Sequence, residues 1–188
     1  NTFFKTLELV FKSKKVSFFQ LRLKNEKLSK KILISKKIIK ICRKYGVKFL
    51  VNDDPILALK VNADGCHLGQ KDMNIIKAKK ILKNKIIGIT CHNSIRFAKK
   101  ALMNGANYIA VGAFYKTKTK QVKFRAKPSI LTKIKKFSDN PVVAIGGINE
   151  KNYKKLLLNK ASFLAISGYI WNNNKYKPYE SIERLKWK

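Results

Sequence analysis

The sequence predicts an α/β fold in which parallel strands are covered by helices, and two observations lead to this prediction. Short apolar runs alternate with Lys-rich amphipathic segments from one end of the chain to the other, which is typical of repeated β/α units. The apolar runs are continuous rather than alternating with polar residues, as expected for strands of a parallel sheet buried on both faces. We expect a single domain over residues 1–188, because no low-complexity linker or Pro-rich boundary interrupts the pattern.

Seven strands are expected, at spacings of 16 to 34 residues. They are the runs rich in β-branched and aromatic residues: Val16–Leu21, Phe49–Val51, Gly65–Leu68, Ile86–Ile89, Tyr108–Val111, Val142–Ile145 and Phe163–Ile166. A doubly wound sheet and a (β/α)8 TIM barrel both accommodate such strands. Because a helical segment precedes the first strand, we favour an N-terminally truncated barrel whose first strand lies upstream of Asn1.

Helices are expected where apolar residues recur with the helical period. They are Thr2–Lys12, Leu28–Tyr45, Pro55–Val61, Asn74–Leu82, Ser94–Asn104, Lys127–Phe137, Glu150–Leu158 and a last segment near Tyr179–Leu185. The start at Pro55 has the clearest signal, because Asp54 can cap the first turn and proline suits the first helical position.

The chain is strongly basic, with 43 Lys and Arg against 10 Asp and Glu and a formal net charge of +33. A charge of this size is compatible with nucleic-acid binding. We instead favour solvated helix faces, because most lysines lie in segments of helical period and no basic run is interleaved with aromatic residues that could stack on bases. Lysines also interrupt every apolar run, so no stretch of about 18 apolar residues could span a membrane.

The three cysteines, Cys42, Cys66 and Cys91, are an odd number and widely spaced. A disulfide framework is therefore not expected, and a reduced, cytoplasmic setting fits better. Two cysteines precede a histidine, which could suggest zinc or a thiol nucleophile. Neighbours on a strand point to opposite faces and no Cys-x-x-Cys accompanies these pairs, so we give zinc little weight.

Polar residues follow the first expected strand, at the edge where parallel β/α proteins carry their active sites. Strand alternation puts Gln20, Arg22 and Lys24 on one face. An amide and two cations suit a pyrophosphate group, because guanidinium and ammonium groups can share its oxygens. A solvated strand end without a ligand explains this motif about equally well.

Carboxylates stand out in so basic a chain, and two of them follow neighbouring expected strands. Asn52 and Asp53 come after the second strand, and Asp72 ends the segment after the third. We predict that Asp53 and Asp72 bind one Mg2+ that also contacts substrate phosphate, since this ion prefers oxygen ligands. Asp72 could also cap the helix that follows it, while Asp64 belongs to the turn before the third strand.

The later strand ends carry small, hydroxyl and cationic residues. They are Thr90 and His92 after the fourth strand, Thr117, Thr119 and Lys120 after the fifth, Gly146 and Gly147 after the sixth, and Ile166 and Ser167 at the end of the seventh. Hydroxyls that alternate with ammonium groups are typical of an anion-binding loop. Glycines at a strand end let backbone amides approach a phosphate, as in the cradle formed by the last two strands of many barrels.

Seven motifs occur in register at these strand ends. They are Gln20-x-Arg-x-Lys24, Phe49-Leu-Val-Asn-Asp53, Ala63-Asp-Gly-x-His-Leu-Gly-Gln-x-Asp72, Gly88-Ile-Thr-x-His92, Gly105-Ala-x-Tyr-x-x-Val-Gly112, Thr117-x-Thr-Lys120 and Ala144-Ile-Gly-Gly-Ile148. With these motifs the chain resembles the thiamine-phosphate synthase family from about Ser17 to Gly168. It departs from the family pattern at Leu23, where Glu is usual, at Thr90, where Ser is usual, and at Lys116, where Pro is usual.

The resemblance implies a (β/α)8 barrel that joins a hydroxymethylpyrimidine diphosphate to a thiazole phosphate in thiamine biosynthesis, with Mg2+ as cofactor. By this similarity, the diphosphate would be held by Arg22, Lys24, Asn52 and Lys120, with Gln20 near the pyrimidine. Asp53 and Asp72 would bind Mg2+. The thiazole phosphate would be held by Thr117, Thr119, the backbone amides of Gly146 and Gly147, and the Ile166-Ser167 turn. Thr90 and His92 would belong to the remaining substrate pocket.

Two alternatives stay open at this point. A thiazole tautomerase of the same superfamily would share the fold and the thiazole phosphate site, with His92 as an acid or base. The diphosphate and metal residues argue against it, because a tautomerase has no diphosphate to bind. The other alternative is a catalytically inactive basic protein that binds phosphate or nucleic acid, which the charge of +33 and Leu23 would favour.

Overall fold

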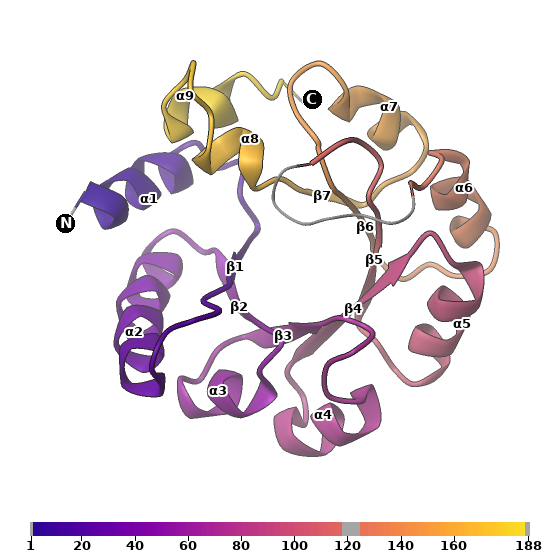
Figure 1. The fold of residues 1–188 in the computed structure, drawn as a ribbon, viewed down its shortest axis with the longest axis horizontal. Helices are drawn as coiled ribbons and strands as arrows, with labels where there is room; N and C mark the ends of the chain where they lie inside the picture. The colour runs from indigo at the N-terminus through magenta and orange to yellow at the C-terminus, as the bar shows by residue number, and fades with distance from the viewer. Residues whose placement is uncertain (1, 118–124, 187–188) are drawn as a thin grey trace. The chain divides into compact units, whose positions relative to one another are not determined.

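The computed structural model of the protein describes residues 2–117 and 125–186 and shows an α/β fold (Figure 1). The chain forms two compact units, Asn1–Gly88 and Ile89–Lys188. Seven strands follow one another in the sheet in the order of the sequence. A doubly wound sheet would reverse its strand order at a switch point, so this alternative is excluded. Whether the chain is one domain stays a prediction.

The first unit contains three complete strands with helices before, between and after them. Its elements are α1 (Thr2–Lys12), β1 (Phe18–Leu21), α2 (Leu28–Lys44), β2 (Lys48–Asn52), α3 (Pro55–Lys60), β3 (Gly65–Leu68) and α4 (Ile75–Leu82). The pairings are parallel, with Gln20 opposite Leu50 and Asn52 opposite His67. This register brings the carboxyl ends of the three strands to the same edge, where the residues that follow them meet.

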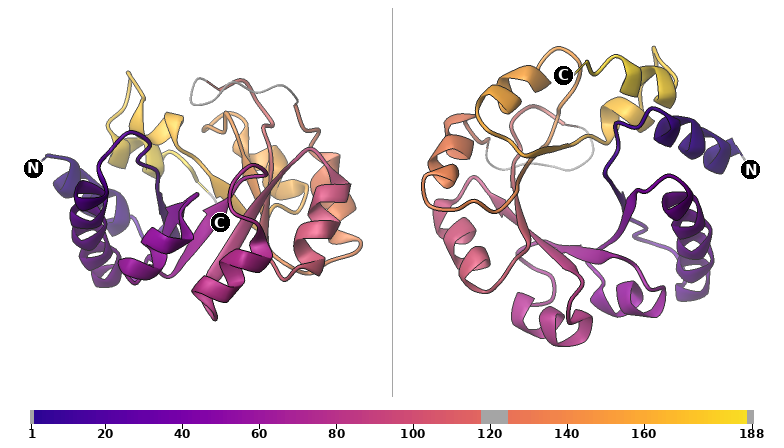
Figure 2. Two further views of the ribbon diagram at one scale, coloured as in Figure 1. Left: turned by 60° about the horizontal axis from the view of Figure 1, so that its bottom comes forward. Right: turned by 180° about the vertical axis from the view of Figure 1, so that it is seen from behind.

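Continuous apolar runs form the buried strands of this unit. The three central residues of β2 and all four residues of β3 are buried, because helices cover both strands, as Figure 2 also shows. Asp64 stabilises the turn before β3, where its carboxylate accepts hydrogen bonds from the Phe49 N–H at 2.8 Å and from Lys48 Nζ at 3.1 Å. This role agrees with the sequence prediction for Asp64.

Two helix caps were predicted in this unit, and the structure confirms the first and contradicts the second. Asp54 caps α3 as predicted, since its carboxylate accepts the Leu57 N–H at 2.8 Å and Pro55 occupies the first turn. The suggestion that Asp72 caps α4 is wrong. Asn74 is the cap and accepts the Ile76 N–H at 2.8 Å, because the helix begins three residues beyond Asp72 and out of reach of its carboxylate.

In the described part of the second unit, three further strands and five helices follow β4 (Ile86–His92) along the chain. Strand β4 begins in the first unit. It is followed by α5 (Ile95–Met103), β5 (Tyr108–Gly112), α6 (Ser129–Lys135), β6 (Val142–Ile145), α7 (Tyr153–Leu158), β7 (Phe163–Ala165), α8 (Gly168–Trp171) and α9 (Pro178–Glu183). Parallel pairing sets Gly112 opposite Ile145, and Ile145 opposite Ala165.

Three elements of the second unit differ most from expectation, and one of them, α7, begins at Tyr153 rather than at Glu150. Strand β4 extends to His92, so Thr90 and His92 lie on the strand rather than after it; β-branched Thr90 and buried Cys91 continue the strand geometry. The short helix α8 follows Ser167 directly, and the sequence did not predict it, because four residues are too few to show a helical period.

The charged and sulfur-containing side chains occupy the places that the composition predicted. Most helix lysines are exposed. All three cysteines are buried with free thiols, and burial raises the pKa of each to about 12. Thiols held in the protonated form are poor zinc ligands. No helix in residues 2–117 and 125–186 is long and apolar enough to cross a bilayer.

Candidate active site

The first cluster of candidate residues lies at the carboxyl ends of β1 and β2. Gln20, Arg22 and Lys24 are exposed, whereas the two leucines between them are half-buried. Exposure thus alternates as far as Lys24, although β1 itself ends at Leu21. That the three polar side chains share one face stays a prediction. Gln20 Nε2 donates a hydrogen bond to Asn52 Oδ1, which joins the end of β1 to the end of β2. An amide pair thus lies at this edge, and two exposed cations follow β1 directly in the sequence.

Two carboxylates complete this cluster from the ends of β2 and β3. Asp53 adopts a left-handed backbone with φ 65°, and its N–H donates to the His67 carbonyl at 2.8 Å. Asp72 folds back on its own turn, where its Oδ2 accepts the Gly69 N–H at 2.7 Å. Both side chains are exposed. Each backbone segment is therefore fixed by a hydrogen bond, which sets the position from which each carboxylate points.

The charges of both carboxylates act on the buried side chains of β3. Burial is the main cause of the raised pKa of Cys66, and the charges of Asp54, Asp53 and Asp72 add to it. His67 is also buried, and burial lowers its pKa to about 4 although the Asp72 charge opposes the change. The imidazole is therefore neutral at pH 7. Cys66 and His67 are both buried, as expected for neighbours on a strand that is covered on both faces.

The described residues contain no group of three or more His, Cys, Asp and Glu side chains arranged to hold a metal ion. A protein-enclosed zinc site requires about four such ligands. Mg2+ instead uses one or two carboxylates and completes its shell with water and substrate phosphate. The oxygen donors of Asp53 and Asp72 fit this second type of site.

In the second unit, the loops after β5 and β6 pack directly against each other. The Phe114 N–H donates to the Ile145 carbonyl and the Tyr115 N–H donates to the Gly146 carbonyl, both at 3.1 Å. A Cβ at Gly147 would lie 2.4 Å from the Lys116 carbonyl oxygen, far closer than real contacts. Glycine is therefore required for this loop packing, a reason that the sequence interpretation, based on phosphate approach, did not include.

Tyr115 and Asn152 fix this pair of loops, and the sequence did not single them out. The Tyr115 hydroxyl donates to the Asn152 carbonyl at 3.1 Å. The Asn152 side chain in turn donates to the Gly147 carbonyl at 3.0 Å and accepts the Asn149 N–H at 2.9 Å. Asn152 thereby closes the turn that begins at Gly147. The sequence placed Asn152 inside the expected helix Glu150–Leu158, whereas α7 begins at Tyr153, which is why sequence reasoning missed it.

The other predicted residues of the second unit occupy several positions. Thr117 is half-buried at the end of the described part of the β5 loop, and Ser167 is exposed directly before α8, after half-buried Ile166. His92 packs its ring against Phe97, with 6.5 Å between centroids. Thr119 and Lys120 lie outside the described residues.

Removing one hydroxyl from this network is expected to destabilise the protein. Tyr115→Phe should lower the free energy of unfolding by about 1 kcal/mol, because a half-buried hydrogen bond to the Asn152 carbonyl is lost. Urea denaturation measures the change. Tyr179→Phe is the matched control, since its hydroxyl makes no hydrogen bond within the described part of the chain. Equal effects of the two substitutions would contradict the role given to Tyr115.

Comparison with known proteins assigns this arrangement to a family. A sequence model of the family described as "Thiamine monophosphate synthase" matches residues 1–170. The chain belongs to this family. A thiamine-phosphate synthase of Pelagibacter ubique is 68% identical over 184 residues, which is 98% of this chain and 89% of the relative. Another, of Marinobacter nauticus, is 39% identical over 153 residues, covering 81% of this chain and 68% of the relative.

A solved structure of the thiamine monophosphate synthase family agrees with the fold. Thiamine phosphate pyrophosphorylase of Pyrococcus furiosus superposes with a TM-score of 0.87 at 30% identity, covering 97% of this chain and 86% of the other. The family resemblance inferred from the seven motifs is thereby confirmed. The parallel α/β architecture is confirmed with it.

Proposed function

We infer that this chain is a thiamine-phosphate synthase, a transferase that joins hydroxymethylpyrimidine diphosphate to thiazole phosphate and releases pyrophosphate. The family match over residues 1–170 carries this conclusion. Both substrates are small anions, which the basic strand ends suit. We further propose that the protein is cytoplasmic and that its fold is of the (β/α)8 TIM-barrel type.

The first cluster is proposed to bind the pyrimidine diphosphate. Arg22 and Lys24 would share the diphosphate oxygens, because both cations are exposed just beyond the end of β1. Gln20 and Asn52 are joined by a hydrogen bond, so the amide of each is oriented before a substrate arrives. Asn52 would contact the diphosphate and Gln20 the pyrimidine. Lys120, which the family resemblance also implies as a diphosphate ligand, lies outside the described residues.

Asp53 and Asp72 are proposed to hold Mg2+ beside the diphosphate. The ion would neutralise charge on the departing pyrophosphate when bound. The oriented Asp72 carboxylate supports this assignment, since the Gly69 N–H engages one of its oxygens. The chain has a net charge of +33, which repels cations in general. Two carboxylates at one edge make the local electrostatic potential less positive there, which favours binding of a cation.

The second unit is proposed to bind the thiazole phosphate. Gly146 and Gly147 would present backbone amides, and Thr117, Thr119 and the Ile166-Ser167 turn would provide further donors. The contacts of Tyr115 and Asn152 keep the two loops in register. Thr90 and His92 would line the remaining pocket from β4.

The proposed reaction needs no covalent intermediate with the protein. The bond between the pyrimidine methylene carbon and the diphosphate oxygen breaks, and its electron pair leaves with pyrophosphate. The electron-rich pyrimidine ring stabilises the resulting cation, and the thiazole nitrogen then forms the new bond to the methylene carbon. Arg22 and Lys24 would balance the growing negative charge on the leaving group, so the chain acts mainly by positioning and electrostatics.

The alternatives considered from the sequence are not favoured. The relatives compared above carry the name of the synthase, and the tautomerase does not account for the cations and carboxylates at the ends of β1, β2 and β3. A catalytically inactive nucleic-acid-binding protein is likewise not supported by the family match.

One assay tests the proposed function. Purified protein with both substrates and Mg2+ should yield thiamine phosphate and pyrophosphate in equal amounts. Absence of both products would refute the synthase function, whereas isomerisation of the thiazole substrate alone would favour the tautomerase.

A further inference from the structure

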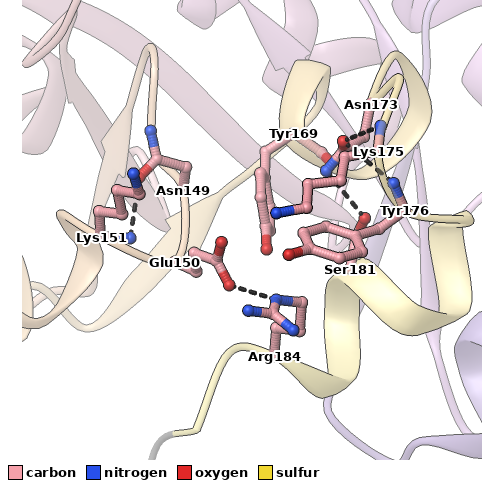
Figure 3. A network of polar contacts seen from close by, with 9 residues as sticks. All are labelled: Asn149, Glu150, Lys151, Tyr169, Asn173, Lys175, Tyr176, Ser181 and Arg184. Atoms are coloured by element: carbon pink, nitrogen blue, oxygen red, sulfur yellow. Dashed lines mark hydrogen bonds and ion pairs between the residues drawn. The ribbon is translucent and has the colours of Figure 1, made fainter.

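An ion pair joins the loop after β6 to the last helix of the chain. Glu150, three residues beyond Gly147, pairs through its carboxylate with Arg184, which caps α9 (Figure 3). The side chain of Tyr169, from α8, lies beside this pair with its hydroxyl directed toward Glu150 (Figure 3). Three segments of the second unit therefore meet at one carboxylate.

A second contact fixes the orientation of Arg184, the partner of Glu150. The Arg184 guanidinium lies 4.2 Å from the centroid of the Tyr176 ring, a favourable cation–π distance. Its hydrogen bond to Glu150 is the main cause of the lowered pKa of that carboxyl group. Glu150 is therefore ionised at neutral pH, and the orientation of Arg184 is defined by two partners rather than one.

Helices α8 and α9 are tied to each other by the segment between them. Asn173 Nδ2 donates to the Tyr169 carbonyl at 3.1 Å and to the buried Ser181 hydroxyl at 3.2 Å, while its Oδ1 accepts the Lys175 N–H at 2.9 Å (Figure 3). The two helices thus form one piece. A contact that fixes Arg184 on α9 also fixes the start of α8.

The start of α8 is the turn that the proposed function uses. Ser167 precedes α8 directly, and Tyr169 follows it by two residues. The other member of the ion pair, Glu150, belongs to the loop after β6, three residues beyond Gly147. A phosphate held by both turns requires them at a fixed separation, because misplaced donors lose much of their binding energy.

We propose that Glu150 is a positioning residue for the thiazole phosphate site, and this inference rests on the proposed function. Through Arg184 it holds the turn before α8 in register with Gly146 and Gly147. The pair is partly open to solvent, since the Arg184 side chain is 46% exposed and the Glu150 side chain 21% exposed. Exposed ion pairs contribute little to global stability. Its effect is therefore expected on substrate binding rather than on folding.

Kinetics of Glu150→Gln test the inference. The variant should raise the KM for thiazole phosphate about fivefold, with KM for the pyrimidine diphosphate and the unfolding temperature unchanged. Arg184→Gln should give the same change. The double variant should be no worse than either single one, because the two side chains act as a unit.

The control for lost negative charge is Glu8→Gln. It removes a carboxylate that pairs with Lys44 on the surface of the first unit and should leave both KM values unchanged. Equal KM changes in the Glu8 and Glu150 variants would overturn the positioning role, as would an unchanged KM in Glu150→Gln.

Amide hydrogen exchange provides a readout that does not depend on activity. Glu150→Gln should speed exchange in residues 146–149 and 167–170 relative to the wild type, while Glu8→Gln should not. If the wild-type protein makes no thiamine phosphate, the proposed function fails by itself. Exchange then decides whether the ion pair orders these turns, and unchanged exchange would refute that ordering.

Discussion

Replacing Asp72 by Asn is expected to reduce synthase turnover roughly 100-fold and to raise the Mg2+ concentration needed for half-maximal activity. The asparagine can still accept the Gly69 N–H, which Asp72 engages at 2.7 Å, so the turn should persist. The substitution removes the charge and one good oxygen ligand. Turnover measured across a Mg2+ titration, with circular dichroism to verify the fold, tests this prediction.

Asp64→Asn is the matched control for this variant. It makes the same change of charge in the same unit, but Asp64 holds the Phe49 N–H and Lys48 at the opposite end of the strands. Its turnover and Mg2+ requirement should equal those of the wild type. If Asp72→Asn also retained both, the assignment of Asp72 as a metal ligand would be wrong.

Replacing Gly147 by Ala is expected to disrupt the thiazole phosphate site more than any change of charge there. The residue has φ +68°, and its new Cβ would meet the Lys116 carbonyl oxygen at 2.4 Å and the Tyr115 carbonyl carbon at 2.8 Å. The loop after β5 must move away, which separates it from the loop after β6. We expect the KM for thiazole phosphate to rise about tenfold, since losing a phosphate contact that contributes about 1.4 kcal/mol of binding free energy weakens binding tenfold.

Gly46→Ala separates backbone strain from steric contact. Gly46 has nearly the same φ, +67°, but no atom lies within 4 Å of its added Cβ. This control should lose about 1–2 kcal/mol of stability through the left-handed conformation alone. Gly147→Ala should lose roughly 1–3 kcal/mol more through overpacking. Urea denaturation and steady-state kinetics of both variants measure the difference, and identical results would refute the proposed loop displacement.

The strands and most helices were predictable because their signals are local. Strands Gly65–Leu68 and Val142–Ile145 and helix Thr2–Lys12 have the predicted bounds. The errors occur where a local signal is misleading. The end of β4 was placed too early because Thr90, Cys91 and His92 resemble a polar loop, whereas pairing within a sheet can extend a strand through such residues.

The candidate site was predictable in part. Gln20, Arg22 and Lys24 are exposed and alternate with half-buried leucines, as predicted, and Asn52, Asp53 and Asp72 lie at or beyond the ends of β2 and β3. The roles of these residues as ligands stay predictions. Asp72 could not be separated from Asn74 as a helix cap by sequence, because both types cap helices and the choice depends on where the first turn forms.

The sequence by itself determined the alternation of strands and helices, the family, and the residues that follow each strand, because periodicity and motif order are written along the chain. Only the tertiary structure decided which distant residues meet. Tyr115 bonds to Asn152 across 37 positions and Arg184 pairs with Glu150 across 34. No local pattern encodes such contacts, since they arise when packed strands bring separate loops together. The close packing of Gly147 against the loop after β5 and the ion pair of Glu150 with α9 are contacts of this kind.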